Sequence, residues 1–233
     1  MLDKSLEYFD FIMKMPYERI TKLPAPQLPD GYTFAFYQDG NEHDWARLEA
    51  SVNEFASEEK ALEYFNREYR DPFREKLYDR CVFVKNPSGR IVATTTAWFM
   101  PSSLGNRGWL QWISTDPAEQ GKGLGKAVII KAMELFPTYE PDSDIYLHTQ
   151  TWSHKAIYLY HKLGFEAFAI DHVKVLWDNE AGYRTMRNNT EKALQELEKV
   201  YTPELIKSLR NGIIQPNARE RTDYPVAEDI LWP

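Results

Sequence analysis

The stretch Gln120-Gly121-Lys122-Gly123-Leu124-Gly125-Lys126 lies where an extended apolar run gives way to a helical pattern. The N-terminus of a helix leaves backbone N–H groups without intrahelical partners, and the helix dipole adds partial positive charge there. Three glycines within five positions let that backbone approach an anion closely. The stretch therefore predicts a phosphate cradle of the kind that holds a nucleotide-like cofactor.

Two familiar phosphate loops do not fit this stretch. The Walker A loop requires Gly, four residues and then Gly-Lys-Ser/Thr, but Gln120 stands five positions before Gly125, and Ala127 follows the lysine. The dinucleotide fingerprint G-x-G-x-x-G fails because Lys126 stands where its third glycine belongs. What remains is Gln-x-x-Gly-x-Gly, with Gly123 as its first glycine, or a glycine-rich turn without a ligand.

The segments around the cradle predict an alternation of strands and helices. Residues 109–115 are rich in aromatic and β-branched types and predict a strand. Residues 145–149 predict a buried strand, and Ser153 is expected to cap the helix that follows. Gly164 ends that helix, and residues 165–170 predict another strand. The predicted order is strand, anion-binding helix, strand, helix, strand.

Further elements are expected on both sides of this region. Strands are predicted at residues 8–15 and 32–37, and a hairpin at 81–84 and 91–99 across a turn at 86–89. Capping sequences predict helices beginning at Asn41, after Ser57, after Asp71-Pro72, at Asn189 or Thr190, and at Thr202-Pro203.

The two motif-bearing segments resemble those of one known family. Gln120-x-x-Gly123-x-Gly125 is followed by Ser153-x-x-Ala156-x-x-Leu159-Tyr160-x-Lys162-Leu163-Gly164-Phe165. Together they resemble the bacterial-type GNAT superfamily of acetyl-CoA-dependent N-acetyltransferases. The family usually has Asn where Ser153 stands and a small aliphatic residue where Thr115 stands. Neither difference removes the backbone groups that would bind the cofactor.

The resemblance implies the GNAT fold, of class α/β (α+β). Its central sheet is mixed, mostly antiparallel and twisted, has about six or seven strands and is flanked by helices. The sheet is expected to splay between the strand ending near 115 and the strand at 143–149. We expect a GNAT domain at 1–177, with its core at 30–172. A helical C-terminal extension at 178–233 would pack on that core, cover the acceptor cleft or build an oligomer such as a homodimer.

The implied reaction transfers the acetyl group of acetyl-CoA to a primary amine, in a small molecule or peptide, by direct attack in a ternary complex without a metal. Backbone groups would hold the pyrophosphate and pantetheine arm, and one N–H near Ile113 or Ser114 would face the thioester oxygen. Ser153 would contact the arm, and Tyr160 would protonate the leaving sulfur. The implied cofactor-binding residues are Ile113, Ser114, Thr115, Gln120, Gly121, Lys122, Gly123, Leu124, Gly125, Lys126 and Ser153.

The residue that deprotonates the acceptor stays open. A free alkyl amine has a pKa near 10.4, so it must lose a proton before attack. Many family members carry a glutamate on the strand before the cradle, but this strand offers Gln111, which cannot take a proton. His148, on the same strand face as Tyr146 and Gln150, is one candidate, Glu54 is another, and a water relay is a third.

The acceptor itself is not readable from the sequence. In this fold the first two helices wall the acceptor site, and here they are aromatic. This composition predicts an apolar or aromatic amine, cation–π capture, or plain helix packing. The aromatic residues concerned are Trp45, Phe55, Tyr64, Phe65, Tyr69 and Phe73.

Composition narrows the class of protein. The formal net charge is −7, which argues against nucleic acid as the main partner, because neutralising phosphates requires a basic face. The single cysteine, Cys81, excludes an intrachain disulfide and is expected to be a buried thiol. Without an apolar run long enough to span a membrane, we expect a cytoplasmic protein. Two alternatives stay open, namely a GNAT-fold module that binds acyl-CoA without catalysis and a transferase that uses another acyl-CoA.

Overall fold

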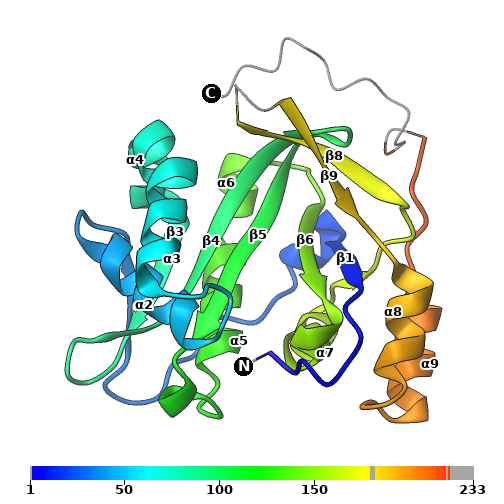
Figure 1. Ribbon diagram of the computed structural model, residues 1–233, viewed down its shortest axis with the longest axis horizontal. Coiled ribbons are helices and arrows are strands. Elements are labelled where there is room, and N and C mark those ends of the chain that lie inside the picture. The colour runs from blue at the N-terminus through cyan, green and yellow to red at the C-terminus, as the bar shows by residue number, and fades with distance from the viewer. Residues whose placement is uncertain (1, 179–181, 219, 221–233) are drawn as a thin grey trace. The chain divides into compact units, whose positions relative to one another are not determined.

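Figure 1 shows the computed structural model, which describes residues 2–178, 182–218 and 220. The chain divides into two compact units. The first comprises residues 1–2, 21–98 and 110–141, and the second comprises residues 3–20, 99–109 and 142–233. Strands β4 (Ile91–Ser102) and β5 (Gly105–Thr115) contribute residues to both units.

The sheet of the first unit is formed by β2, β3 and the adjoining parts of β4 and β5, hydrogen-bonded in that order. β2 (Thr33–Phe36) pairs antiparallel with β3 (Cys81–Lys85). β3 and β4 form the hairpin predicted across residues 86–89, with Phe83 opposite Thr94. The first four residues of β3 are buried, which requires cover on both faces of the sheet.

Helices supply that cover (Figure 1). Ser57 begins α3 as predicted, because its hydroxyl accepts a hydrogen bond from the Lys60 amide at 3.2 Å. α2 is capped differently from the prediction: Gly40, at φ 98°, is its N-cap, and the first helical residue is Asn41. The helical elements of this unit are α2 (Asn41–Ser51), α3 (Glu58–Phe65), the π-helical turn η1 (Asn66–Arg70), α4 (Asp71–Arg80), the 3₁₀ turn η2 (Pro117–Glu119), α5 (Leu124–Met133) and α6 (Phe136–Tyr139).

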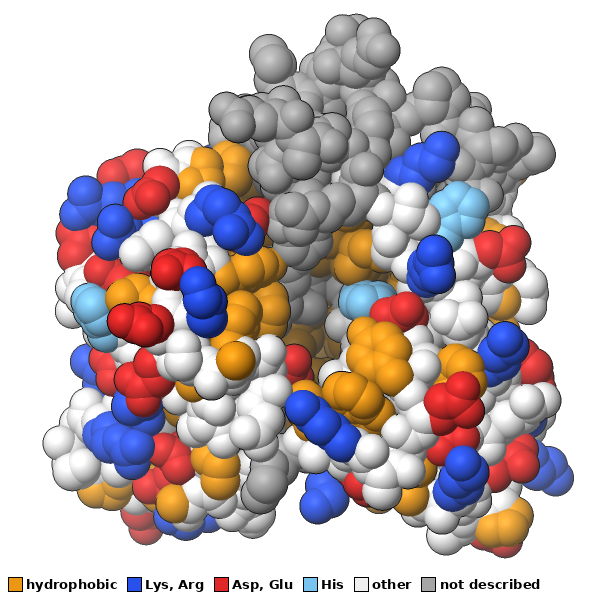
Figure 2. All heavy atoms as spheres, in the orientation of Figure 1, with side chains coloured by type: hydrophobic (Ala, Val, Ile, Leu, Met, Phe, Trp, Pro, Cys, Tyr) orange, Lys and Arg blue, Asp and Glu red, His pale blue; other side chains and the backbone are white. Residues whose placement is uncertain are grey.

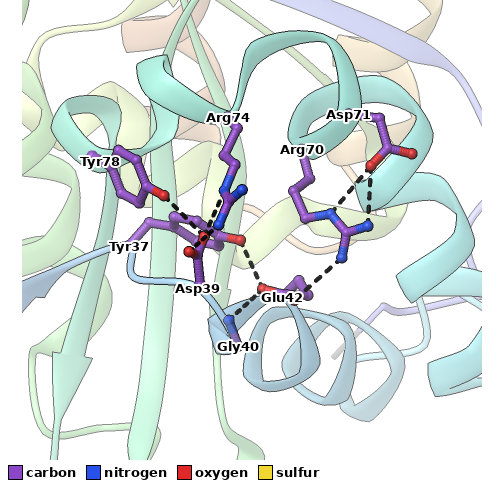
Figure 3. Close-up of polar contacts among 8 residues, drawn as sticks. All are labelled: Tyr37, Asp39, Gly40, Glu42, Arg70, Asp71, Arg74 and Tyr78. Atoms are coloured by element: carbon purple, nitrogen blue, oxygen red, sulfur yellow. Dashed lines mark hydrogen bonds and ion pairs between the residues drawn. The ribbon is translucent and has the colours of Figure 1, made fainter.

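A polar cluster holds the start of α2 against η1 and α4 (Figure 3). Glu42 accepts hydrogen bonds from the Tyr37 hydroxyl at 2.7 Å and from the Gly40 amide at 2.8 Å, and it pairs with Arg70 at 3.4 Å. Arg74 of α4 donates from Nε to Asp39 at 2.8 Å. These contacts join segments far apart in the sequence, so they fix where α2 and η1 lie in this unit.

The second unit is built around β6 (Ile145–Gln150), β1 (Asp10–Met15) and β7 (Glu166–Ala167). β1 lies between the other two and is antiparallel to both. The first residues of β5 pair in parallel with β6, through Gly108–Ile145 and Trp109–Tyr146.

The remaining elements of this unit follow the strand core. α7 (His154–Leu163) ends at Gly164, whose φ of 103° is the left-handed geometry predicted for that stop. The Thr202 hydroxyl caps α9 through the Leu205 amide at 3.3 Å, also as predicted. The other elements are α1 (Tyr17–Ile20), the 3₁₀ turn η3 (Thr151–Ser153), β8 (His172–Asp178), β9 (Gly182–Arg187), α8 (Thr190–Leu197) and α9 (Pro203–Asn211).

The predicted fold class is confirmed, since the sheet is mixed, mostly antiparallel and flanked by helices. Several boundaries differ from the predictions. The strand expected over 165–170 extends only over Glu166–Ala167. β8 begins at His172 and pairs with β9, so the segment after residue 178 begins with a strand rather than a helix. Residues 221–233 of the expected extension lie outside the described residues.

Candidate functional site

The glycine-rich segment forms the start of α5 in the first unit. Gly121 and Gly123 both have φ of 81°, and Gly123 is the N-cap of the helix. A Cβ at either glycine would meet nothing within 4 Å, so the left-handed backbone, and not packing, requires glycine. The first backbone bond into the helix runs from the Ala127 amide to the Gly123 carbonyl at 3.0 Å. Within the described part of the chain, the amides of residues 124–126 donate to no acceptor, which leaves these donors available for a ligand.

The loop before this helix is anchored by its own side chains. Glu119 accepts hydrogen bonds from the Tyr32 hydroxyl at 2.7 Å and from Lys122 Nζ at 2.5 Å. The hydrogen bond from Lys122 is the main reason that the pKa of Glu119 falls to about 2. Gln120 donates to the Thr115 carbonyl at 3.1 Å, which ties the loop to the end of β5. Lys126 is exposed. The cradle is thus preformed, which lowers the cost of ordering it around a ligand.

The backbone of β5 is irregular at Trp112, whose φ is 53°. A bulky residue rarely adopts a positive φ, and such outliers gather at functional sites. Neighbouring strand residues normally face opposite sides of a sheet. Here Gln111 and Trp112 both contact the Tyr69 hydroxyl, which donates to Gln111 Oε1 at 2.5 Å and accepts from Trp112 Nε1 at 2.7 Å. β5 therefore has a bulge-like irregularity at Trp112.

Tyr69 reaches this irregularity from η1. π-helical turns are rare in proteins as a whole. Those that occur are often at functional sites, because the extra residue redirects the side chains that follow. Tyr69 is 3% exposed, and burial raises its pKa well above the ordinary value, so the hydroxyl stays protonated. The irregular turn and the irregular strand thus meet at one hydroxyl group.

Glu49 is the residue of this region that the sequence analysis missed. It lies on the buried face of α2 and is fully buried. Its Oε2 accepts a hydrogen bond from the Ser114 hydroxyl at 2.8 Å, and its Oε1 has no partner among the described residues. Burial raises the pKa of Glu49 to about 8. The helical spacing from Trp45 was the available signal, because it places Glu49 on the same stripe as Leu48 and Val52.

The aromatic residues beside α2 pack on one another. The Trp112 ring lies 5.4 Å from Trp45, 5.3 Å from Phe55 and 5.1 Å from Tyr64, measured between centroids. Phe55 and Tyr64 are themselves 5.3 Å apart. These are the separations of rings in direct contact, so the cluster has no gap for a cation between its faces. Helix packing therefore explains the cluster, while three half-buried rings, those of Phe55, Tyr64 and Trp112, leave apolar surface at its edge.

His148 lies in the second unit, on β6. Its Nε2 is 3.1 Å from Asp10 Oδ1, and the Tyr8 hydroxyl donates to the same oxygen at 3.1 Å. Burial is the largest single influence on Asp10 and would raise its pKa. The hydrogen bonds from His148 and Tyr8, with the charges of His148 and Arg187, together outweigh burial, so the pKa lies below the ordinary range. Asp10 therefore stays ionised and can orient the imidazole. The sequence analysis did not name Asp10, because the pairing of β1 with β6 brings it there.

The two other predicted residues of this unit lie on or beside α7. Tyr160 is 4% exposed, and its ring contacts Phe165 edge to face at 6.2 Å. Ser153 stands at the N-cap position, but its hydroxyl makes no capping bond, so that prediction is wrong. Its amide instead donates to Gln150 Oε1 at 2.8 Å. The half-buried hydroxyl is therefore not committed to the helix.

The structure thus divides the predicted site residues between its units. Residues 113–115 and the cradle at 120–126 belong to the first unit. His148, Ser153 and Tyr160 belong to the second.

Charge and composition of the surface add little to the site. Acidic and basic side chains are interspersed over the face in Figure 2, which is not the basic face that nucleic acid requires. In the parts of the chain that the structure describes, no group of three or more His, Cys, Asp or Glu residues could hold a metal ion. Among the described helices, none combines the length and apolar character needed to cross a bilayer.

Comparison with known proteins agrees with this fold. The model of the acetyltransferase (GNAT) family matches residues 23–165. A mycothiol acetyltransferase of Thermobispora bispora is 26% identical over 157 residues, which are 65% of this chain and 52% of the relative. One from Saccharomonospora viridis is 27% identical over 155 residues, 64% of this chain and 50% of the relative. The chain thus spans about half the length of these curated relatives.

Solved structures support the same fold. A GCN5-related N-acetyltransferase from Sphaerobacter thermophilus superposes with a TM-score of 0.54 at 18% identity, over 79% of this chain and 53% of that one. The matched family model covers more than half of the chain and includes both the cradle and α7. The chain belongs to the GNAT acetyltransferase family.

Proposed function

We propose that the protein transfers the acetyl group of acetyl-CoA to a primary amine, by direct attack within a ternary complex. The observation that carries this proposal is the start of α5, where left-handed glycines precede amides that have no acceptor among the described residues. Family membership supplies the reaction type. The curated relatives are mycothiol acetyltransferases, but the low identity and partial coverage do not carry their acceptor over to this chain.

The cradle at 120–126 would bind the pyrophosphate of coenzyme A. Backbone donors at a helix N-terminus combine hydrogen bonding with the favourable end of the helix dipole. Lys126 is exposed and adds positive charge beside them, whereas Lys122 is already paired with Glu119. We therefore propose that Lys122 holds the loop, with the phosphate as a second partner.

The irregular part of β5 would bind the acyl end of the cofactor. From the resemblance to the GNAT family, we expect a backbone N–H near Ile113 or Ser114 to face the thioester oxygen. The positive φ of Trp112 turns the backbone immediately before these residues. A preorganised N–H donor stabilises the oxyanion that forms when the amine attacks, and removing one such donor costs roughly 100- to 1000-fold in rate.

Proton transfers complete the reaction. We assign protonation of the leaving sulfur to Tyr160, on the resemblance of α7 to the family motif. His148 is a candidate acceptor of the amine proton, because its Nε2 lies 3.1 Å from the ionised Asp10, which would orient the imidazole.

The experiment that tests the function is an amine screen that follows free CoA thiol with time. Full-length protein, acetyl-CoA and a panel of small and peptide amines are combined, and acetyl-CoA binding is measured separately by calorimetry. Turnover with at least one amine supports the proposal. Binding without turnover favours a module that binds acyl-CoA without catalysis, and turnover only with longer acyl-CoA donors favours a different acyl group. The absence of both binding and turnover contradicts the proposal altogether.

A further inference from the structure

Glu49 is a buried carboxyl group that the proposed chemistry has not yet used. Its side chain is fully buried, and Oε1 has no partner among the described residues. A buried polar atom without a partner costs stability, and native proteins retain few of them. Such an atom calls for an explanation, which a proton-transfer role would supply.

The groups around Glu49 do not neutralise it. The Ser114 hydroxyl of β5 hydrogen-bonds it, while the Cys81 thiol of β3 and the carboxylate of Glu54 interact with it electrostatically. Burial raises the pKa of Cys81 to about 12, so that thiol is neutral, and Glu54 repels a second negative charge. Within the described chain Glu49 forms no ion pair, so it is not one half of a structural salt bridge.

Ser114 connects Glu49 to the part of β5 that the proposed function uses. Ser114 follows Trp112 by two residues, and both side chains contact α2, Ser114 through Glu49 and Trp112 through Trp45. The Trp112 ring contacts Trp45 of α2, the same helix that carries Glu49. Trp112 is half-buried, whereas Ser114 is 5% exposed. Of the pair, Ser114 therefore lies beside the expected position of the acyl group, and Glu49 lies in the interior.

We propose that Ser114 and Glu49 form a proton relay that accepts the proton of the acceptor amine. Ser114 is the group that touches the amine, and Glu49 is a positioning residue that acts through it. This inference rests on the proposed acetyl transfer and names the residues that would deprotonate the amine. It competes with His148, which lies in the other unit.

The step balances without any further reactant. The acceptor reaches the site as the neutral amine, its ammonium proton having passed to solvent. The amine nitrogen then attacks the thioester carbonyl carbon, and an N–C bond forms. One N–H proton passes to Ser114 Oγ while the Ser114 proton passes to Glu49 Oε2. The C–S bond then breaks, and the sulfur takes a proton from Tyr160. Exchange with water afterwards returns the Glu49 proton to solvent and restores Tyr160.

A carboxyl group in this setting suits the task. General-base catalysis is most efficient when the pKa of the base lies near the working pH, and burial moves a glutamate toward that range. An ordinary solvated glutamate such as Glu63, whose side chain is 63% exposed, lacks that setting. Glu63→Gln therefore serves as the matched control for Glu49→Gln.

The test compares pH–rate profiles of the full-length chain between about pH 6 and pH 10, with acetyl-CoA and an amine that the wild type acetylates. Glu49→Gln should lower kcat/KM by about 100-fold or more and remove the acidic limb of the profile. Acetyl-CoA affinity, measured by calorimetry, should stay within about twofold, and Glu63→Gln should behave as wild type. Ser114→Ala should reproduce the Glu49→Gln profile. The double variant should be no slower than either single variant, because both belong to one relay.

The outcomes separate the relay from the proposed function. A Glu49→Gln variant that keeps the wild-type rate and acidic limb overturns the relay, while wild-type turnover leaves acetyl transfer standing. If His148→Gln removes the acidic limb and Glu49→Gln does not, His148 is the base. Failure of the wild type on every amine contradicts the proposed function and the relay together. If Glu49→Gln does not fold, Ser114→Ala decides the question by the same readout.

Discussion

Replacing Glu49 with glutamine should remove a large part of the pH dependence of stability. In the folded protein the pKa of Glu49 is about 8, against 4.5 for a solvated glutamate. Below about pH 4.5 the carboxyl is protonated in both the folded and the unfolded protein. The stability that depends on keeping it protonated is then fully present. As the pH rises toward 8, the unfolded chain releases the proton and the folded chain keeps it. Stability therefore falls with rising pH through this window and changes no further above it.

The size of the effect follows from the shift. The difference between the two pKa values is about 3.5 units, and each unit corresponds to about 1.4 kcal/mol. The wild type should therefore lose up to about 5 kcal/mol of unfolding free energy from this group as the pH rises through the window. Glu49→Gln is neutral at every pH and keeps an oxygen that can accept from Ser114, so its own contribution has no slope.

The assay is urea denaturation of wild type and variant at pH values between about 5 and 9. The difference between the two free energies of unfolding should change in favour of the variant by about 1.4 kcal/mol per pH unit up to about pH 8 and then level off. Glu63→Gln, which alters an exposed carboxyl, should run parallel to the wild type. Parallel curves for Glu49→Gln would refute the reasoning, because they would mean that Glu49 is ionised in the folded state near neutral pH.

Three other substitutions test the remaining parts of the site. Gly123→Ala should weaken acetyl-CoA binding and lower stability by about 1 to 2 kcal/mol, because its φ of 81° disfavours a side chain; unchanged calorimetry would exclude the cradle. Tyr160→Phe should lower kcat by about 100-fold with little change in the KM for acetyl-CoA, and a wild-type rate would remove Tyr160 from the mechanism. Tyr69→Phe removes the hydroxyl shared by Gln111 and Trp112, so kcat should fall by about tenfold or more while acetyl-CoA still binds. The control variant Tyr139→Phe, at a tyrosine that is 38% exposed, should keep most of the activity; an equal loss in both would count against the proposed role of Tyr69.

Local signals in the sequence were enough to predict most of the elements. Left-handed glycines, capping hydroxyls and turn residues act on their immediate neighbours, so their effect can be read without the fold. Gly164 ends α7, Ser57 begins α3 and Thr202 begins α9 as predicted. The cradle at 120–126 could be predicted for the same reason, because its backbone geometry depends on glycine itself.

Where local signals were short or ambiguous, packing decided the outcome. The apolar residues at 165–170 predicted a strand, but the strand extends only over Glu166–Ala167, which pair with β1 from the start of the chain, and Phe168 adds an isolated bridge to Ile214. The side-chain cap at this point comes from Gln150 and not from Ser153, because Gln150 Oε1 accepts the Ser153 amide at the start of η3. Which hydrogen-bond or strand partner a residue takes depends on the groups that surround it in the folded protein. The local sequence does not specify those groups.

The sequence by itself determined most of the strands and helices before residue 165, the glycine-rich start of α5 and the family motifs, because each rests on contacts between near neighbours. Only the tertiary structure decided that Glu49 is buried against Ser114, that Asp10 reaches His148, and that Tyr69 meets the irregular backbone at Trp112. The physical reason is that the burial, the pKa and the backbone strain of a residue are set by the groups around it in the folded protein. These surroundings are assembled from segments that the chain brings together only when it folds.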